Sequence, residues 1–392
     1  MRRTAIIIAM LAIMIPVVTG AEATYHDVPT GSTVNDVAIA ADGGYMIAGT
    51  DEGRIICIQQ DGTVLWNVST GSAVTTVDIA DSRGYVAAGT DRGDVILLGR
   101  NGEYYWTRSI AGPVRDLAFS GDGRALAVGG ERIALYDYQG KENWNFSTVA
   151  APPAAPQTIV SVAITQDGNY IAAGSDNGVI YFIGKRGNMI WQSLARGPVT
   201  AVDTNRDGSL IAVGSRDRAL QVYGRPGMLS WVMPTGASIL ALALSEDGRF
   251  IVVGKEGGDV ECYRPDEGLL WRDRIGGDVV TVDVSRRGEA AAAGTADGTI
   301  RLFGGESAMR WSFGAGAPVR AVALSENGDY LAAGAGDRAL IFRTADPPMP
   351  ARLEDPESTT PRPTPTLAGG EGAIVGLLAI GAAGAACRLR RR

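Results

Sequence analysis

The sequence has 392 residues and is acidic, with 36 Lys and Arg against 43 Asp and Glu and a formal net charge of -7. Nucleic-acid affinity depends largely on Lys and Arg contacts to phosphate, so this balance argues against a nucleic-acid partner. The single histidine, His26, excludes a His-based catalytic triad and a multi-histidine metal site within one chain.

Residues 1–23 have the organisation of a secretory signal peptide. Arg2 and Arg3 precede an apolar run from Ala5 to Val18, and Ala21-Glu22-Ala23 offers small residues for cleavage. We therefore predict a signal peptide over 1–23. An uncleaved anchor is the alternative, although the apolar run is short for a membrane span, which usually needs about 20 residues.

Residues 24–345 are built from a repeat of about 40 residues, and four of the six spacings between successive tryptophans are 40. The tryptophans are Trp66, Trp106, Trp144, Trp191, Trp231, Trp271 and Trp311. A marker glycine follows two small or apolar residues in each unit, at Gly49, Gly89, Gly129, Gly174, Gly214, Gly254, Gly294 and Gly334. Eight marker glycines predict eight structural units.

Each unit contains the pattern of four antiparallel strands. Apolar residues alternate before an Asp-Gly turn, such as Asp167-Gly168, and a second strand ends at the marker glycine. A third strand and a fourth, Trp-bearing strand follow. Four strands per 40 residues predict one propeller blade, so we expect an all-β, eight-bladed β-propeller.

The first and last units are incomplete in a complementary way. Counting 23 residues back from Gly49 reaches His26, which takes the place of the tryptophan, whereas the last unit stops near Arg343. We predict that the N-terminal segment supplies the outer strand of the last blade and thereby removes the free sheet edges. His26 then has a packing role.

The residues after the repeats predict a stalk and a membrane segment. Residues 346–366 are rich in Pro, Thr and charge, which favours an extended linker. We predict a transmembrane or sorting helix over 367–387, with a basic cytoplasmic tail over 388–392 that satisfies the positive-inside rule. Cys387, at the end of this segment, is either lipidated or an ordinary membrane residue.

The units resemble two families of propeller repeats. Residues Ser161 to Ile183, with Ala172-Ala173-Gly174-Ser175-Asp176, resemble WD-type repeats but lack their Gly-His and Trp-Asp pairs. Residues Asp61 to Trp66 are similar to repeats of the pyrroloquinoline-quinone (PQQ) type. WD propellers imply protein interaction, and PQQ-type propellers imply either a dehydrogenase or an outer-surface scaffold. The terminal segments together resemble those of archaeal membrane-anchored surface proteins, without the Pro-Gly-Phe motif of one tail class.

Several acidic residues fall on the predicted innermost strands, which line the central channel of a propeller. A ring of carboxylates there could bind Ca²⁺ or another cation. The alternative is that each carboxylate accepts hydrogen bonds from neighbouring strands or loops. The candidate channel carboxylates are Asp36, Asp78, Asp116, Asp203 and Asp283.

Two further kinds of candidate site lie at the periphery. Asn67 and Asn145 head glycosylation sequons and directly follow a tryptophan, so we expect them to point outward. The one insertion in the ring, Ala150-Ala151-Pro152-Pro153-Ala154-Ala155-Pro156, is predicted to form a partner-binding loop, with a neutral insertion as the alternative. Cys57 and Cys262 belong to non-neighbouring units and are predicted to be core residues rather than a disulfide.

The functional prediction is a membrane-anchored, extracytoplasmic propeller that binds or scaffolds other envelope or extracellular proteins and is not an enzyme. A quinone-dependent dehydrogenase-like enzyme and an envelope-protein assembly factor are the alternatives. The PQQ resemblance implies, for the enzyme, a bound quinone, Ca²⁺ and long inserts that carry the active site, whereas the repeats are almost free of inserts. We therefore predict no catalytic residue, no metal site and no cofactor.

Overall fold

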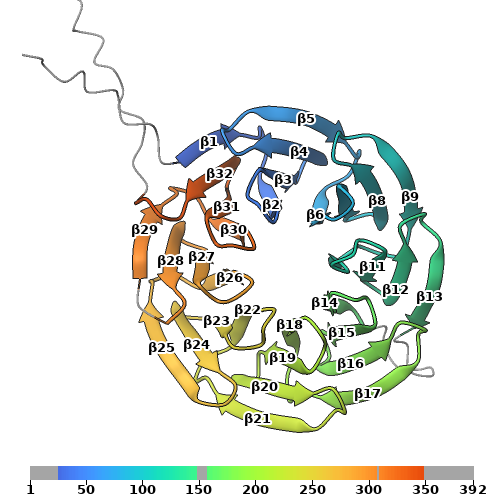
Figure 1. Cartoon of the computed structure of the whole chain (residues 1–392), viewed down its shortest axis with the longest axis vertical. Helices are drawn as coiled ribbons and strands as arrows, with labels where there is room; N and C mark the ends of the chain where they lie inside the picture. The colour runs from blue at the N-terminus through green and yellow to red at the C-terminus, as the bar shows by residue number, and fades with distance from the viewer. Residues whose placement is uncertain (1–24, 148–156, 307–308, 348–392) are drawn as a thin grey trace, which may run out of the picture. The chain divides into compact units, whose positions relative to one another are not determined.

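The computed structural model describes residues 25–147, 157–306 and 309–347, and these form a closed ring of eight four-stranded antiparallel sheets (Figure 1). The predicted eight-bladed propeller is therefore confirmed. The predicted signal peptide, residues 348–366 of the predicted stalk and the predicted C-terminal helix and tail lie outside the described residues, so these assignments stay predictions. Within the described residues there is no helix that is long and apolar enough to cross a membrane.

The blades follow the chain, from the innermost strand of each to its outermost. Blade 1 contains β2 (Val34–Ile39), β3 (Tyr45–Thr50), β4 (Arg54–Gln59) and β5 (Val64–Ser69); blade 2 contains β6 (Val74–Ala80), β7 (Tyr85–Thr90), β8 (Asp94–Gly99) and β9 (Tyr104–Ser109); and blade 3 contains β10 (Asp116–Phe119), β11 (Ala125–Gly129), β12 (Arg132–Asp137) and β13 (Glu142–Ser147). Blade 4 contains β14 (Ile159–Ile164), β15 (Tyr170–Ser175), β16 (Val179–Gly184) and β17 (Met189–Leu194); blade 5 contains β18 (Val199–Thr204), β19 (Leu210–Ser215), β20 (Ala219–Gly224) and β21 (Leu229–Pro234); and blade 6 contains β22 (Ile239–Leu244), β23 (Ile251–Lys255), β24 (Asp259–Arg264) and β25 (Gly268–Arg274). Blade 7 contains β26 (Val279–Val284), β27 (Ala290–Thr295), β28 (Thr299–Gly304) and β29 (Met309–Gly314), and blade 8 contains β30 (Val319–Leu324), β31 (Tyr330–Ala335), β32 (Arg338–Arg343) and β1 (Tyr25–Pro29).

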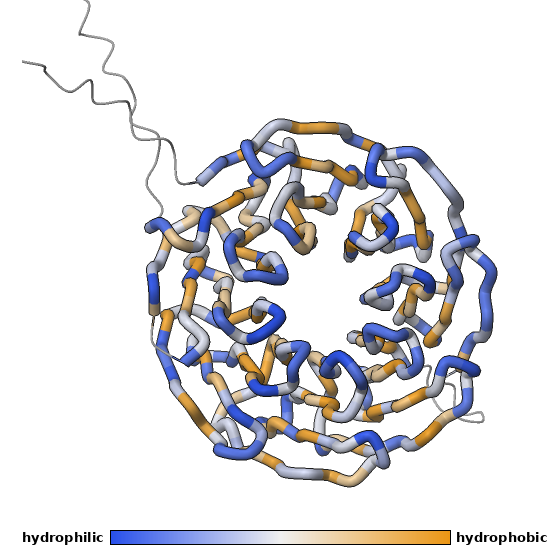
Figure 2. Tube along the Cα trace, in the orientation of Figure 1, coloured by the Kyte–Doolittle hydropathy of each residue, from blue (hydrophilic) through white to orange (hydrophobic). Residues whose placement is uncertain are grey.

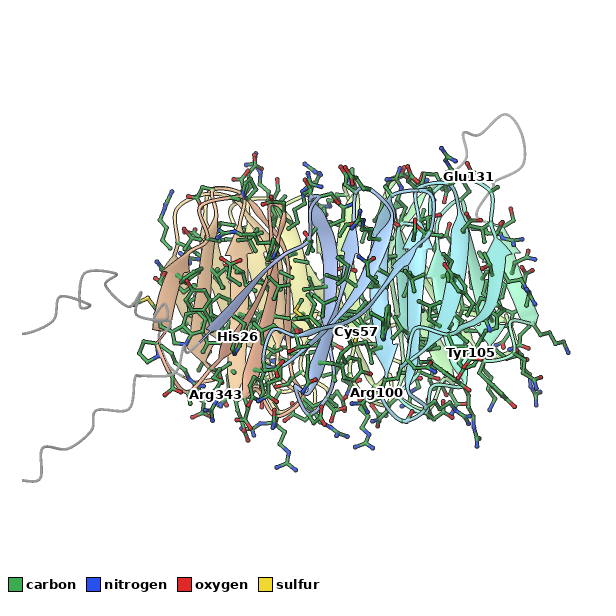
Figure 3. The ribbon with its side chains drawn as sticks, turned by 90° about the horizontal axis from the view of Figure 1, so that it is seen from above. His26, Cys57, Arg100, Tyr105, Glu131 and Arg343 are labelled. Carbon is green, nitrogen blue, oxygen red and sulfur yellow. The ribbon has the colours of Figure 1, made fainter. Side chains whose placement is uncertain are left out.

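The ring has two faces. We call the face with the second turn of each blade and the connections between blades the connection face, and the face with the first and third turns the hairpin face. In Figure 3, Glu131 marks the connection face, whereas Arg100 and Arg343 mark the hairpin face. The hydrophilic stretches of the trace include many of these turns, whereas apolar residues alternate along the strands (Figure 2).

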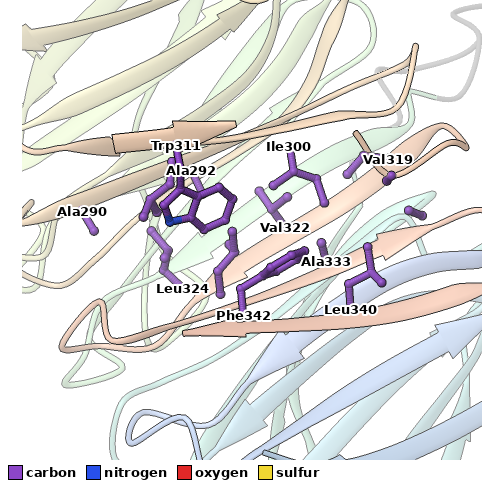
Figure 4. Packing of buried hydrophobic residues seen from close by; sticks show 14 residues of the cluster. Ala290, Ala292, Ile300, Trp311, Val319, Val322, Leu324, Ala333, Leu340 and Phe342 are labelled. Atoms are coloured by element: carbon purple, nitrogen blue, oxygen red, sulfur yellow. The ribbon is translucent and has the colours of Figure 1, made fainter. Parts of the chain in front are cut away.

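The hydrophobic core lies between neighbouring blades, because each sheet buries both faces. Between blades 7 and 8, Trp311 packs with Val322, Leu324 and Phe342 (Figure 4). Similar clusters recur around the ring. A propeller core is therefore a set of equivalent inter-blade layers, which explains why one 40-residue pattern recurs along the sequence.

The marker glycines are required by the close approach of consecutive blades. A Cβ atom on Gly174 would lie 2.3 Å from Cγ1 of Val199 in the next inner strand. The same relation holds for each marker glycine and a Val or Ile of the next blade, including Gly334 and Val34 across the chain ends. The repeated glycine therefore gives room to a β-branched residue one blade ahead.

The tryptophans join each blade to the next one. Trp66 Nε1 donates a hydrogen bond to the Arg100 carbonyl oxygen at 2.7 Å, in the third turn of blade 2, and the other six tryptophans do the same one blade further on. His26 occupies the eighth such position, where its ring packs against Gly62 of blade 1.

The two ends of the chain close the ring, as predicted. β1 pairs antiparallel with β32, with His26 opposite Ile341. The ring of Tyr25 packs on Phe313 and Phe342 at centroid distances of 5.0 and 5.4 Å, and Arg338 forms an ion pair with Asp27 at 2.7 Å. Closure therefore combines backbone pairing with aromatic and ionic contacts.

Candidate protein-binding surface and central channel

The five candidate channel carboxylates link the inner strands of neighbouring blades. Asp203 accepts a hydrogen bond from the amide of Thr204, its own neighbour, at 2.7 Å and from the amide of Leu244 in the next blade at 2.8 Å. The same arrangement joins Asp36 to Val77, Asp78 to Phe119, Asp116 to Val162 and Asp283 to Leu324, at 2.6 to 2.8 Å. We call these carboxylates the aspartate straps.

The aspartate straps occupy two sequence positions. Asp36 and Asp116 lie opposite the marker glycine of the second strand, whereas the other three lie two residues further along. Between blades 4 and 5 the Ser161 hydroxyl accepts a hydrogen bond from the Val202 amide at 3.2 Å. In the described residues, alanines fill both positions in blade 6 and in blade 8, so these two junctions have no strap.

The strap carboxyls are partly buried beside the channel. Burial raises the pKa of Asp78, Asp116 and Asp203 to about 7, although their backbone hydrogen bonds act in the opposite direction. Burial likewise raises the pKa of Asp36 and Asp283 to about 6. Each carboxyl serves its own blade junction, and no group of three or more His, Cys, Asp or Glu side chains in the described ranges could hold a metal ion.

The hairpin face is held together around the channel mouth. The first turns of blades 4 to 8 and of blade 1 form a chain of five backbone hydrogen bonds, which begins with the Gln166 amide and the Arg206 carbonyl and ends with Glu326 and Ala41. Arg286 forms ion pairs with both Glu246, at 3.0 Å, and Glu326, at 2.7 Å. Further ion pairs on this face join Arg225 to Asp207 and Arg264 to Glu267.

The turns of the connection face contain a group of acidic side chains without a cationic partner. On blades 6, 7, 8 and 1, six carboxylates form no ion pair with any described residue, and we call this set the acidic arc: Glu256, Asp278, Asp297, Asp337, Asp51 and Glu52. Most basic side chains of the adjacent strands form ion pairs with carboxylates that do not belong to the acidic arc. Lys255, Arg301 and Arg338 already pair with other carboxylates, which leaves Arg54 and Arg320.

The opposite half of the connection face has a different balance of charge. Five arginines accompany the carboxylates on blades 2 to 5: Arg92, Arg115, Arg196, Arg216 and Arg218. The net negative charge of the connection face is therefore concentrated on the blades that form the acidic arc.

Apolar side chains lie beside the acidic arc, at the start of the inner strands. Val280 of blade 7 is 36% exposed, and Leu240 is partly exposed in the equivalent position of blade 6. Ser147 and Gln157, which flank the predicted loop Ala150–Pro156, lie at this face, whereas the loop itself lies outside the described residues, so its binding role stays a prediction.

The remaining candidate residues lie away from the channel. Asn67 and Asn145 are exposed on the outer strands β5 and β13, in the outward position that the sequence suggested, while their glycosylation stays a prediction. Cys57 and Cys262 are buried as free thiols, and burial raises their pKa to about 12. Both therefore belong to the core.

Sequence reasoning missed a buried ionic group in blade 6. Glu261, which is fully buried, accepts hydrogen bonds from Lys255 at 2.7 Å, Arg272 at 2.6 Å and the Tyr263 hydroxyl at 2.6 Å. Lys255 follows the marker glycine, where Thr or Ser stands in five other units, and this departure was the available signal. The cluster is fully paired, so it offers no free group, and removal of one partner would leave a buried charge without compensation.

The family model for outer membrane protein assembly factor BamB matches residues 51–236. Among solved structures, a computationally designed protein, Ika8, is 17% identical with a TM-score of 0.69 over 81% of this chain and 98% of its own. Chaetomium thermophilum Sqt1, bound to the N-terminus of ribosomal protein L10, is 13% identical with a TM-score of 0.71 over 81% and 98%. The C-terminal WD40 domain of Sif2 is 13% identical with a TM-score of 0.69 over 79% and 96%.

No curated protein matches the sequence significantly. The structural similarities are at low identity and therefore establish the fold alone. The family match shows that the repeats within residues 51–236 are similar to PQQ-like repeats, and the solved structures show the β-propeller fold that WD40 domains share.

Proposed function

We propose that this protein is a non-catalytic binding module and that its connection face holds a cationic segment of a partner protein. The observation that carries the proposal is the charge contrast between the two faces. On the hairpin face, arginines lie among the carboxylates and pair with several of them, such as Asp207, Glu246 and Glu326, whereas no carboxylate of the acidic arc has such a partner among the described residues. Complementary charge across an interface steers association and suppresses wrong partners.

The apolar residues beside the arc supply the second component of such a surface. An interface needs an apolar contact area within a polar surround, and Val280 and Leu240 lie at the channel edge next to the acidic turns. A segment that places Lys or Arg over the arc and an apolar side chain at the channel mouth fits both features. The Sqt1 structure, in which a propeller of this fold is bound to the N-terminus of another protein, supports this class of partner.

Charge reversal on one face tests the proposal. Glu52, Glu256 and Asp337 are exposed and their side chains make no hydrogen bond or ion pair within the described part of the chain, so their replacement by Lys leaves the fold intact. We expect the amount of partner that the triple variant captures from solubilised membranes to fall at least about tenfold, as measured by quantitative mass spectrometry.

A matched control carries the same change of charge on the other face. Glu103, Asp266 and Glu289 are exposed on the hairpin face, and their triple Lys variant should retain the capture of the unmodified protein. Equal capture by both variants, or equal loss, would overturn the assignment of the binding face. Melting curves of both variants verify that folding is unchanged.

We also propose that the propeller is exported and anchored by its terminal segments. Two apolar stretches with flanking arginines support this, and so does the place where the chain leaves the ring. Tyr25 pairs with Phe342, so the described chain begins and ends at the hairpin-face end of blade 8. Both ends of the described chain therefore lie at the face opposite the connection face.

A further inference from the structure

The outermost strand of every blade is a free sheet edge. The strand order places β1, β5, β9, β13, β17, β21, β25 and β29 at the end of their sheets, so one side of each backbone ladder has no partner strand among the described residues. Free edges invite pairing with another chain, and proteins usually protect them with charged residues or proline.

Most outer strands of this ring have such protection. Charged residues or a proline occur in β1, β9, β13, β21, β25 and β29, for example Arg108 in β9 and Pro234 in β21. β5 is uncharged but contains the Asn67 sequon. Only β17, among the described outer strands, has no charge, no proline and no sequon.

The exposed side chains of β17 are largely apolar. Ile190 is 39% and Leu194 is 68% exposed, and they alternate with Trp191 and Ser193, which are half-buried against blade 5. The third turn of blade 5 lies over Trp191, and Met228 in this turn is 73% exposed. Both faces of β17 therefore have exposed apolar side chains nearby, Ile190 and Leu194 on one face and Met228 of blade 5 beside the other.

We propose that β17 is a docking edge for an extended segment of a partner protein, which adds to blade 4 as a fifth strand. The unpaired ladder requires an extended partner, because only a β-strand can satisfy alternating amide and carbonyl groups. Ile190, Gln192 and Leu194 lie on the same exposed face of β17 and are uncharged. Since side chains of paired strands contact one another on the same face, we expect an uncharged segment with apolar residues at every second position. This edge is separate from the connection face, and its occupant is a different segment from the cationic one.

Binding of a synthetic peptide tests the edge directly. The probe is a fluorescent, end-capped nine-residue peptide of alternating valine and threonine, added to the full chain. We expect saturable binding by anisotropy and slower amide hydrogen exchange in β17 but not in β5. Ile190→Lys should weaken binding at least about tenfold, because it puts a charge into the edge and removes an apolar contact.

The matched control is Leu65→Lys, at the equivalent position of β5, where the side chain is 50% exposed. This variant should bind the peptide as the unmodified chain does. Absence of saturable binding, or the same affinity in both variants, would overturn the proposal. Self-association of the free protein that Ile190→Lys abolishes would assign the edge to a second copy instead and would also overturn it.

Discussion

The role of the strap aspartates is set by the backbone amides that surround them in the closed ring. In the sequence, the five carboxylates occupy two different positions of the repeat, and a cation site was one interpretation. In the ring each of them receives two backbone amides and links two blades, as Asp203 does with Thr204 and Leu244. Their common function is therefore to join adjacent inner strands.

The straps make stability depend on pH. Burial raises the pKa of Asp78, Asp116 and Asp203 from an ordinary value near 3.8 to about 7, so the folded state binds protons more tightly than the unfolded chain between these values. This stabilisation is fully present below about pH 4 and is lost as the pH rises through about 7. One pKa unit corresponds to about 1.4 kcal/mol.

We therefore expect the melting temperature to fall by several degrees between about pH 5 and pH 8, measured by calorimetry at constant ionic strength. Asp203→Asn should flatten this dependence, since the amide does not titrate, although it loses one of the two accepted hydrogen bonds. Glu103→Gln, at the exposed hairpin face, is the control and should leave the dependence unchanged. A pH profile of Asp203→Asn that follows the unmodified protein would contradict the role of the straps.

His26 predicts a gain of stability at the closing junction. Seven tryptophans donate a hydrogen bond to the next blade, and the equivalent acceptor for position 26 is the Gln60 carbonyl oxygen. His26→Trp should add this bond and more buried area, and it should raise the free energy of unfolding by about 1 kcal/mol. Trp66→His, the reverse change at an equivalent position, should lower it, as chemical denaturation would show. Destabilisation by His26→Trp would mean that the eighth position cannot take the same geometry.

At the scale of elements, β1 is the part of the fold whose loss has the largest expected effect. It supplies five residues of backbone pairing to β32, the Tyr25 aromatic contacts and the Asp27 ion pair with Arg338. It also belongs to a blade without an aspartate strap to the next one, because Ala321 and Ala323 replace the carboxylates there. The junction between blades 8 and 1 therefore relies on β1 in addition to the packing of β2 and β3 against blade 8.

Deletion of residues 24–31 should lower the free energy of unfolding by at least about 3 kcal/mol, since it removes buried Val28 and the Tyr25 contacts. The exposed β32 edge should also cause concentration-dependent association. Thermal denaturation and light scattering measure the two effects. An unchanged melting temperature would show that the remaining three strands of blade 8 close the ring by themselves.

At the scale of the whole molecule, the first prediction concerns topology. We expect residues 24–366 outside the membrane and residues 388–392 inside, because apolar segments with flanking arginines stand at both ends of the sequence. Protease added to intact cells should cleave within residues 346–366 and release the propeller, whose paired strands resist digestion. Full protection of this segment until the membrane is broken would contradict the predicted topology.

The second whole-molecule prediction concerns catalysis. Purified protein should show no dye-linked oxidation of alcohols or sugars after addition of pyrroloquinoline quinone and Ca²⁺. A known quinone-dependent dehydrogenase, assayed in parallel, verifies the conditions. Reproducible turnover that is lost when either the quinone or the Ca²⁺ is omitted would replace the binding-module proposal by the enzyme alternative.

The sequence alone was sufficient for the repeat, the number of blades and the closure by the N-terminal strand. Each of these depends on contacts that recur at a constant offset, so the same glycine, tryptophan and turn residues appear at a regular interval. Gly174 and Trp191 are recognisable from the sequence because every blade makes the same contacts with the next one at these two positions.

The tertiary structure decided what differs between blades. Asp36 and Asp78 perform the same role from two sequence positions, because both carboxylates reach an amide in the following inner strand. The contrast between the faces and the unprotected β17 edge depend on which side chains meet across blades that are far apart in the chain. Pairing of charges, burial and free ladder edges are properties of the closed ring, and no local pattern along the chain contains them.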